Sequence, residues 1–288
     1  MFTNLRNNKF IFFFPILIVF VISSIAIADS EKTFGKDNKD ENYYYELGIS
    51  HQTYGRNQEA LDAYKQAIRI NPDYTPAYFG LGATHEALNE YQEAIDAYNQ
   101  AIRINPDDDL AYSRIGYVYG LMGKHQDALD AFKRAVRIKP DSANAHFNLA
   151  IAYAKLGKHQ EARDAFKQVI RIEPDDAYVH FGLGLSYAGL EKQQEAIDAF
   201  KQAIRIKPDF IAAQYNLGIA YEVTGKFKEA KDAFKQAMKI KPDYAKAHYG
   251  LGLVYVNTDD KSSALDEYKI LKDLDKELAT KLFKLIYP

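Results

Sequence analysis

The chain has 288 residues, of which 47% are hydrophobic and 26% are charged, and its formal net charge is −2. A balance this close to neutral is too mild to indicate nucleic-acid binding, which requires a basic stripe. The absence of cysteine excludes disulfides, thiolate metal sites, cysteine nucleophiles and a lipid-modified N-terminal cysteine.

The first 28 residues have the three parts of a secretory signal peptide. Arg6 and Lys9 provide positive charge, an apolar run begins at Phe10, and an A-x-A step ends at Ala28. We therefore expect cleavage after Ala28.

The alternative is an uncleaved membrane anchor, because residues 10–28 are just long enough to span a bilayer as a helix. In both cases the positive charges hold the N-terminus inside, and the rest of the chain is expected on the far side of the membrane. The protein would be periplasmic or secreted if cleaved after Ala28, and membrane-anchored if not. Residues 29–40 are rich in charge without periodic apolar positions, which predicts a flexible linker.

Residues 41–276 repeat with a period of 34 residues. A basic residue and an isoleucine come shortly before a proline, and an aspartate follows it, at Pro72, Pro106, Pro140, Pro174, Pro208 and Pro242. Self-similarity of this length indicates a solenoid in which each unit packs on its neighbours. With the proline at position 32, the seven units are 41–74, 75–108, 109–142, 143–176, 177–210, 211–244 and 245–276.

Each unit has the pattern of two helices joined by a turn. Positions 4, 7, 8 and 11 share one face of a first helix, and positions 20, 24 and 27 share one face of a second. We expect the small residue at position 8 to face the small residue at position 20, as in Gly184 and Ala196, with the aromatic residue at position 24 beside them. Glycine at position 15, or Asn89 in the second unit, suits a left-handed turn after the first helix.

This pattern resembles the tetratricopeptide repeat (TPR) family. The resemblance rests on an aliphatic residue at position 7, glycine or alanine at 8, alanine at 20, an aromatic residue at 24 and the proline at 32. It implies an all-α fold, a right-handed α-solenoid of stacked helix-turn-helix units. It also implies a protein without catalytic activity that binds a peptide or protein partner on a concave surface lined by the first helices.

The seventh unit departs from the pattern and indicates where the solenoid ends. Asp259 takes the place of glycine in its turn, Leu271 replaces the small residue at position 27, and Lys276 stands where the proline should be. We expect residues 277–288 to form a capping helix, because the last unit of a solenoid needs a cover. Its apolar face would consist of Leu278, Leu282, Leu285 and Ile286. The alternative is an amphipathic helix that binds a partner.

Packing within a unit leaves one face of the first helix open, at positions 2, 5, 6, 9, 12 and 13. We call it the position-5 face. Aromatic residues occupy position 5 in six of the seven units, and asparagines occupy position 6 in two. The candidate peptide-binding residues are Tyr45, Phe79, Phe147, Asn148, Phe181, Tyr215, Asn216 and Tyr249.

Aromatic side chains carry much of the binding energy of protein interfaces, so this row predicts a groove for an extended or helical peptide. The alternative is that the rings pack between neighbouring first helices and only form the wall of the groove. Charged residues on this face are few, which favours a weakly charged, apolar or amide-rich peptide. Some TPR proteins clamp a terminal carboxylate with lysine at position 5 and asparagine at position 9. The first unit has Tyr45 and Ile49 there, so no such clamp is expected.

No cofactor, metal or catalytic site is expected. The seven histidines share three repeat positions, so those on adjacent units lie one repeat apart, too far for a single zinc ion. We expect them to serve packing. The chain has no glycine-rich phosphate loop and no local Ser-His-Asp set.

The sequence therefore predicts an exported, non-enzymatic interaction scaffold. One alternative is a structural protein that self-assembles by end-to-end stacking of repeats through the open N-terminal face around Tyr43–Tyr45. Another is a TPR accessory subunit of an enzyme complex.

Overall fold

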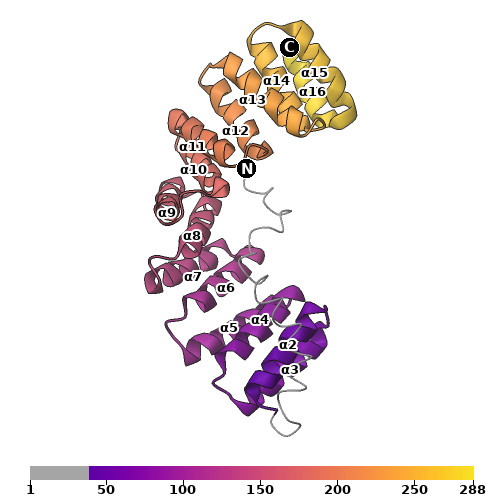
Figure 1. Ribbon diagram of the computed structural model, residues 1–288. Coiled ribbons are helices and arrows are strands. Elements are labelled where there is room, and N and C mark those ends of the chain that lie inside the picture. The colour runs from indigo at the N-terminus through magenta and orange to yellow at the C-terminus, as the bar shows by residue number, and fades with distance from the viewer. Residues whose placement is uncertain (1–38) are drawn as a thin grey trace. The chain divides into compact units, whose positions relative to one another are not determined.

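The computed structural model describes residues 39–288, and these form fifteen helices and no strand (Figure 1). The predicted signal peptide or anchor at 1–28 lies outside the described residues, as does most of the predicted linker at 29–40. In the part of the chain that is described, no helix is long and apolar enough to cross a membrane.

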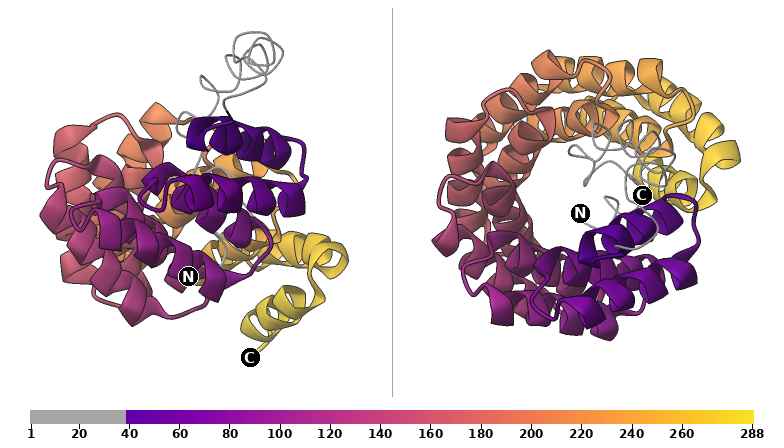
Figure 2. Two further views of the ribbon diagram at one scale, coloured as in Figure 1. Left: turned by 90° about the horizontal axis from the view of Figure 1, so that it is seen from below. Right: turned by 60° about the horizontal axis from the view of Figure 1, so that its bottom comes forward.

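The described residues divide into two compact units, 39–156 and 157–288. The described helices of the first unit are α2 (Glu41–Thr53), α3 (Asn57–Ile70), α4 (Thr75–Ala87), α5 (Tyr91–Ile104), α6 (Asp109–Leu121), α7 (His125–Ile138) and α8 (Ala143–Lys155). Those of the second unit are α9 (His159–Ile172), α10 (Ala177–Gly189), α11 (Gln193–Ile206), α12 (Ile211–Val223), α13 (Phe227–Ile240), α14 (Ala245–Asn257), α15 (Lys261–Leu274) and α16 (Lys276–Ile286). Within each unit, consecutive helices pack against each other in chain order (Figures 1 and 2).

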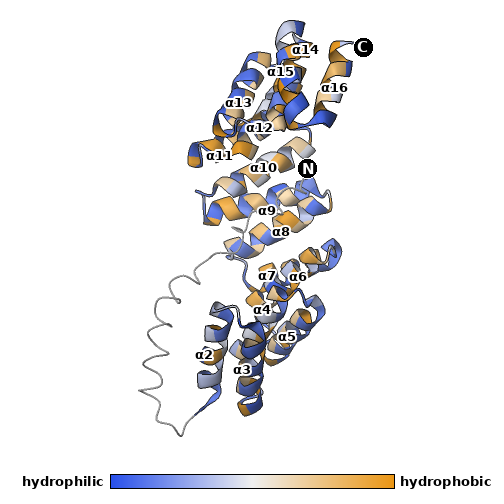
Figure 3. Cartoon of the chain, turned by 90° about the vertical axis from the view of Figure 1, so that its right-hand side faces the viewer, coloured by the Kyte–Doolittle hydropathy of each residue, from blue (hydrophilic) through white to orange (hydrophobic). Residues whose placement is uncertain are grey.

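The helix bounds follow the 34-residue spacing. From α2 to α15, a first helix occupies positions 1–13 of a repeat and a second helix occupies positions 17–30. We call these the A helix and the B helix. Polar and apolar residues are mixed along the B helices α3 to α13 (Figure 3), which have a buried side and an exposed side. The A helix α10 is covered on all sides, with Phe181–Ser186 buried.

The turn between the A and B helices needs a left-handed residue at position 15. Four repeats have a glycine there, with φ between 70° and 74°: Gly55, Gly123, Gly157 and Gly225. Asn89 adopts the same conformation with φ 61°, as the sequence indicated. Glu191 and Asp259 also adopt it, with φ 60° and 56°, although a side chain disfavours this region.

The aromatic ring at position 24 is the centre of packing between A helices. Phe234 is fully buried, and a Cβ atom added to Gly218 or Gly250 would lie 2.6 or 2.7 Å from its ring. Gly218 is at position 8 of the same repeat and Gly250 is at position 6 of the next. The ring therefore fills a slot between two consecutive A helices.

The ring also explains why position 8 is small. The three atoms nearest to a Cβ added to Gly184 belong to the Phe200 ring, at 2.5–3.1 Å, so a flat ring lies directly on the A-helix backbone. Ala196 at position 20 is fully buried in the same repeat, and its expected contact with Gly184 stays a prediction.

A cation–π contact also joins consecutive repeats. A lysine ammonium from a B helix lies 5.7–5.8 Å from the ring centroid of a tyrosine at position 11 of the next A helix, in the pairs Lys133–Tyr153, Lys167–Tyr187 and Lys201–Tyr221. Each such contact contributes roughly 0.5–1 kcal/mol at an exposed site. The pairs therefore reinforce stacking at the surface of each unit.

Helix α16 covers the end of the last repeat. Ala279, Leu282 and Ile286 are at most 3% exposed and belong to the apolar cluster that includes Leu271. Leu282 lies against Gly252, which is at position 8 of the last repeat. An aliphatic side chain from α16 thus occupies the place that a position-24 ring takes beside position 8 in other repeats.

Two details of the expected cap are wrong. Helix α16 begins at Lys276 and not at residue 277, because the Asp275 carboxylate accepts hydrogen bonds from the backbone N–H groups of Glu277 and Leu278. Leu285 was expected on the covered face but is 47% exposed. At about 100° per residue, Leu285 lies to one side of the face that Ala279, Leu282 and Ile286 define.

Candidate peptide-binding face

The structure places the position-5 rings directly over the position-24 rings of the same repeats. Their centroids are 5.7–5.9 Å apart in four repeats: Tyr45–Tyr64, Phe79–Tyr98, Phe181–Phe200 and Tyr215–Phe234. Five position-5 rings are half-buried, namely Tyr45, Phe79, Phe147, Tyr215 and Tyr249. Phe181 is an exception with 7% exposure. The rings thus pack within their repeats and most of them keep an uncovered part, so peptide binding stays a prediction.

A third ring joins this layer in three repeats. Position 34, just before the next A helix, carries Tyr74, Phe210 and Tyr244. Their centroids lie 4.9–5.7 Å from the position-5 rings Tyr45, Phe181 and Tyr215. Phe181 has the shortest of these distances and is buried, whereas Tyr45 and Tyr215 keep an uncovered part despite their third ring.

The intervening repeats use position 34 differently. Asp108, Ser142 and Asp176 stand there, and their side chains accept hydrogen bonds from the first backbone N–H groups of the next A helix. Each of the first six repeats therefore has either a third ring or a polar helix cap at this position. Position 34 of the sequence already carries this difference, with a ring in repeats 1, 5 and 6 and a polar residue in repeats 2 to 4, although the expected site did not include it.

The two candidate asparagines are less open than the sequence suggested. Asn148 is 9% exposed. The Asn216 side chain donates a hydrogen bond of 2.7 Å to the backbone carbonyl of Ala212, one turn earlier in α12. The Asn216 Nδ2 group must therefore give up or share a hydrogen bond to hold a peptide backbone.

Glu86, at position 12, is compensated by its surroundings. One carboxylate oxygen accepts a 2.6 Å hydrogen bond from the Tyr98 hydroxyl, and the other lies 3.8 Å from Arg114. Burial raises the pKa of Glu86, while Tyr98 and Arg114 act in the opposite direction. The pKa of Tyr98 is raised by burial first and by the Glu86 carboxylate second.

Glu222 occupies the same position in the sixth repeat but has fewer partners. Position 24 of its repeat is Phe234, which has no hydroxyl group. Glu222 accepts a hydrogen bond of 3.2 Å from the Asn257 side chain and forms no ion pair with a described residue. Burial raises the pKa of Glu222. Its carboxylate is thus a half-buried acid without a cation beside it.

The histidines at position 4 bind the preceding turn. Nε2 lies 2.9 Å from the carbonyl oxygen of the preceding repeat's proline in three pairs: His146 with Pro140, His180 with Pro174, and His248 with Pro242. Tyr78 makes the equivalent contact through its hydroxyl, which donates to Pro72 at 3.1 Å. Across residues 39–288, no group of three or more histidines and carboxylates could hold a metal ion.

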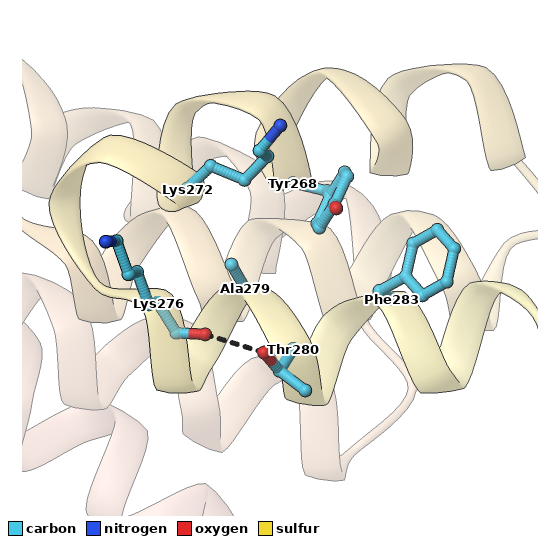
Figure 4. Close-up of a pocket in the computed structure, with 6 residues that line it drawn as sticks. All are labelled: Tyr268, Lys272, Lys276, Ala279, Thr280 and Phe283. Atoms are coloured by element: carbon cyan, nitrogen blue, oxygen red, sulfur yellow. Dashed lines mark hydrogen bonds between the residues drawn. The ribbon is translucent and has the colours of Figure 1, made fainter.

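A cavity of about 300 Å³ lies between α15 and α16, on surfaces that do not belong to the position-5 face (Figure 4). It is lined by Tyr268, Lys272, Lys276, Ala279, Thr280 and Phe283. This cavity could not be predicted from the sequence, because it depends on how the cap packs against the last B helix.

The repeated helix pair, its left-handed turn and its ring slot define a TPR protein. Residues 54–89 match the model of the TPR repeat. The chain belongs to the family described as the C-terminal domain of cilia and flagella-associated protein 70, whose model matches residues 74–278. No curated protein sequence matches the chain.

Several solved structures share the fold. The crystal structure of the MamA protein is 26% identical, with 58% of this chain and 92% of MamA covered and a TM-score of 0.54. YrrB, described as a TPR protein with an unusual peptide-binding site, is 22% identical, with coverages of 66% and 99% and a TM-score of 0.57. A tetratricopeptide repeat protein from Parabacteroides merdae is 17% identical, with coverages of 87% and 100% and a TM-score of 0.63.

Proposed function

We propose that the protein is an exported, non-catalytic TPR scaffold that binds a peptide or protein segment on the position-5 face of its A helices. The observation that carries this proposal is the row of half-buried rings on that face, most of them backed by a buried position-24 ring. A ring fixed from below loses little side-chain freedom when a partner covers its other side, which favours binding. YrrB, a TPR protein described as having a peptide-binding site, supports the same use of the fold.

The proposed partner segment is mainly apolar or rich in amides, with one basic residue placed near Glu222. Most of the row is aromatic, which suits apolar side chains. Glu222 is the half-buried acid on this face that lacks a cation, whereas Glu86 already has Arg114 and Glu46 is exposed. A lysine or arginine of the partner would supply the missing charge at Glu222.

Capture of the partner from the exported compartment tests this proposal. The informative variant is the double substitution Phe79→Ser with Phe147→Ser, because the third repeat already carries Ser113 at position 5 and serine is therefore compatible with the fold. We expect at least about 10-fold weaker capture, since aromatic anchors often contribute more than about 1.4 kcal/mol each.

A matched control removes a half-buried ring from a different surface. Tyr91 lies at position 17, at the start of α5, and the fifth repeat has Gln193 at the same position. Tyr91→Gln should leave capture unchanged. If the double variant captures as much partner as the wild-type chain, the partner does not bind on the position-5 face.

Glu222→Gln tests the charge of the partner. The substitution should weaken capture about 3- to 10-fold if a basic residue pairs with this acid, and added salt should reduce the difference. Glu86→Gln serves as the control, because Glu86 is already compensated. A larger loss for Glu86→Gln than for Glu222→Gln would contradict the proposed basic residue.

Export is a separate part of the proposal and has its own test. N-terminal sequencing of the mature protein should begin at Asp29 if the signal peptide is cleaved. An N-terminus at Met1 in the membrane fraction would support the anchor, and a chain recovered only from the cytoplasm would contradict export altogether. Light scattering at high concentration tests the alternative of end-to-end assembly, which a monomer would exclude.

A further inference from the structure

The cavity between α15 and α16 has the features of a second binding site. In Figure 4, Lys276 lies at one end, Phe283 at the other, and Ala279 between them. Its floor is small and fixed, because Ala279 is 3% exposed and Leu282 holds α16 against Gly252. The Thr280 hydroxyl donates to the backbone carbonyl of Lys276 at 2.8 Å, so the wall of the cavity is internally bonded.

The cavity forms because the last repeat breaks the repeat pattern. Leu271 replaces the small residue at position 27 and is fully buried under α16. Asp275 then adopts an extended backbone conformation with φ −157°, which redirects the chain into α16. The last B helix and the cap therefore meet along Tyr268, Ala279 and Phe283, where repeats 1 to 6 are followed by another A helix.

One side of the cavity is aromatic. The Tyr268 and Phe283 centroids are 5.1 Å apart, and the Phe283 and Tyr287 centroids are also 5.1 Å apart. Phe283 is 42% exposed and Tyr287 is 53% exposed. Three rings in contact thus extend from the cavity toward the end of the chain without a cover from the described residues.

The other side is cationic. Lys272 and Lys276 line the cavity, and neither forms an ion pair with a carboxylate in residues 39–288. Two other lysines of the same helices are neutralised by acids of their own helix. Lys269 lies 2.8 Å from Asp266, and Lys281 lies 2.6 Å from Glu277.

Three acids adjoin these lysines in sequence, Asp273, Asp275 and Glu277, and none of them forms an ion pair with Lys272 or Lys276. The Asp275 carboxylate accepts hydrogen bonds of 3.0 Å from the backbone N–H groups of Glu277 and Leu278, and it acts as the helix cap of α16. Lys272 lies 6.0 Å from the Tyr268 ring centroid, so this ammonium is held over the aromatic side of the cavity. The site therefore combines two lysines that form no ion pair with a described residue and an exposed aromatic row.

We propose that this cavity binds an acidic peptide segment in which a carboxylate side chain is next to an aromatic or aliphatic one. The carboxylate lies between Lys272 and Lys276, and the apolar side chain lies on Ala279 against Tyr268 and Phe283. A peptide fits better than a small molecule for two reasons. The volume of about 300 Å³ is at the lower limit for small-molecule pockets, and the aromatic row continues beyond the cavity to Tyr287.

The test is a titration of the full-length chain with a labelled, end-blocked peptide of sequence Gly-Glu-Glu-Phe-Leu-Gly. Lys272→Gln with Lys276→Gln should weaken binding about 10-fold, because two charge pairs are lost. Lys269→Gln with Lys281→Gln changes the net charge equally and should weaken binding less than about 2-fold. Phe283→Ala should weaken binding of the glutamate peptide. A second peptide, with glutamine in place of both glutamates, should bind the wild-type chain no more tightly than the glutamate peptide binds the Phe283→Ala variant.

Two results would overturn the site. One is equal weakening by the two lysine pairs, which would indicate general charge attraction. The other is the absence of saturable binding to the wild-type chain. Neither result depends on the position-5 face, because Phe79→Ser with Phe147→Ser leaves the cavity intact and should not change this titration.

Discussion

Two layers of aromatic rings run along the A helices, and they differ in what surrounds them. A position-24 ring such as Phe200 is 1% exposed and lies on a glycine backbone, whereas a position-5 ring such as Phe79 lies over its position-24 neighbour and is half-buried. In repeats 1 to 6 the inner layer has no surface left for a partner, whereas most rings of the outer layer keep an uncovered part. Residue type alone does not separate rings that stabilise the fold from rings that can bind, but burial does.

The third repeat shows that the two layers are also independent. Phe132 keeps the inner ring with 6% exposure, while Ser113 stands at position 5. The scaffold therefore tolerates the loss of an outer ring but retains an inner ring in every repeat. The following predictions test this difference, beginning with the largest expected effect.

Removal of an inner ring should cost the most. Phe234→Ala empties the slot between Gly218 and Gly250 and should lower the free energy of unfolding by about 3–5 kcal/mol. Phe79→Ser, in the outer layer, should cost less than about 2 kcal/mol because only part of the ring is buried. Denaturant titration of both variants measures the difference, and equal losses would show that the layers are not distinct.

Filling the slot from the glycine side should also destabilise. A Cβ at Gly218 would lie 2.6 Å from the Phe234 ring, so Gly218→Ala should cost about 1–3 kcal/mol. Gly120 provides the control, because nothing lies within 4 Å of an added Cβ and the residue is inside α6. Gly120→Ala should stabilise by about 0.5–1 kcal/mol. The same sign of change in both variants would contradict the ring slot.

The hydroxyl group of an inner tyrosine should matter less than its ring. Tyr98→Phe removes the 2.6 Å hydrogen bond to Glu86 and should cost about 1 kcal/mol. The double variant Tyr98→Phe with Glu86→Ala copies the fifth repeat, which has Ala188 and Phe200, and should recover part of this loss. No recovery in thermal unfolding would mean that Glu86 is held by contacts other than Tyr98.

The smallest effect concerns Glu222 and depends on pH. A raised pKa means that the folded state binds a proton more readily than the unfolded state. At a pH above the pKa of Glu222 in the folded state, the ionised carboxylate therefore lowers the free energy of unfolding. This destabilisation disappears as the pH falls to 4.5, the ordinary pKa of a glutamate. Glu222→Gln should raise the melting temperature at pH 7 and have no effect below pH 4.5. A stabilisation that is equal at both pH values would contradict this origin.

Much of the fold could be predicted from the sequence, because each repeat is defined by local signals. The proline at position 32, the glycine at position 15 and the aromatic residue at position 24 recur with the 34-residue period. The expectation of an all-α TPR architecture is confirmed by the helices and by the family match. Helical periodicity could not tell that the Phe200 ring lies directly on the Gly184 backbone, since Ala196 and Phe200 share one helix face.

The sequence predicted which residues form the candidate site but not what surrounds each of them. The repeat positions of the outer rings follow from the spacing, whereas the contact between the Phe210 and Phe181 rings depends on the loop before α12. The cavity beside Lys272 depends on where α16 turns back, which is fixed by Asp275. The repeat pattern cannot predict the contacts of elements that depart from it, such as the cap α16.

Site-specific photocrosslinking tests the central claim most directly. A photoreactive phenylalanine derivative that replaces Phe79, in the outer ring layer, should crosslink to the captured partner, because the substitution preserves the aromatic ring. The same derivative in place of Tyr91, on the B helix of the same repeat, should give no crosslink. A crosslink from residue 91 and none from residue 79 would contradict a partner bound on the position-5 face.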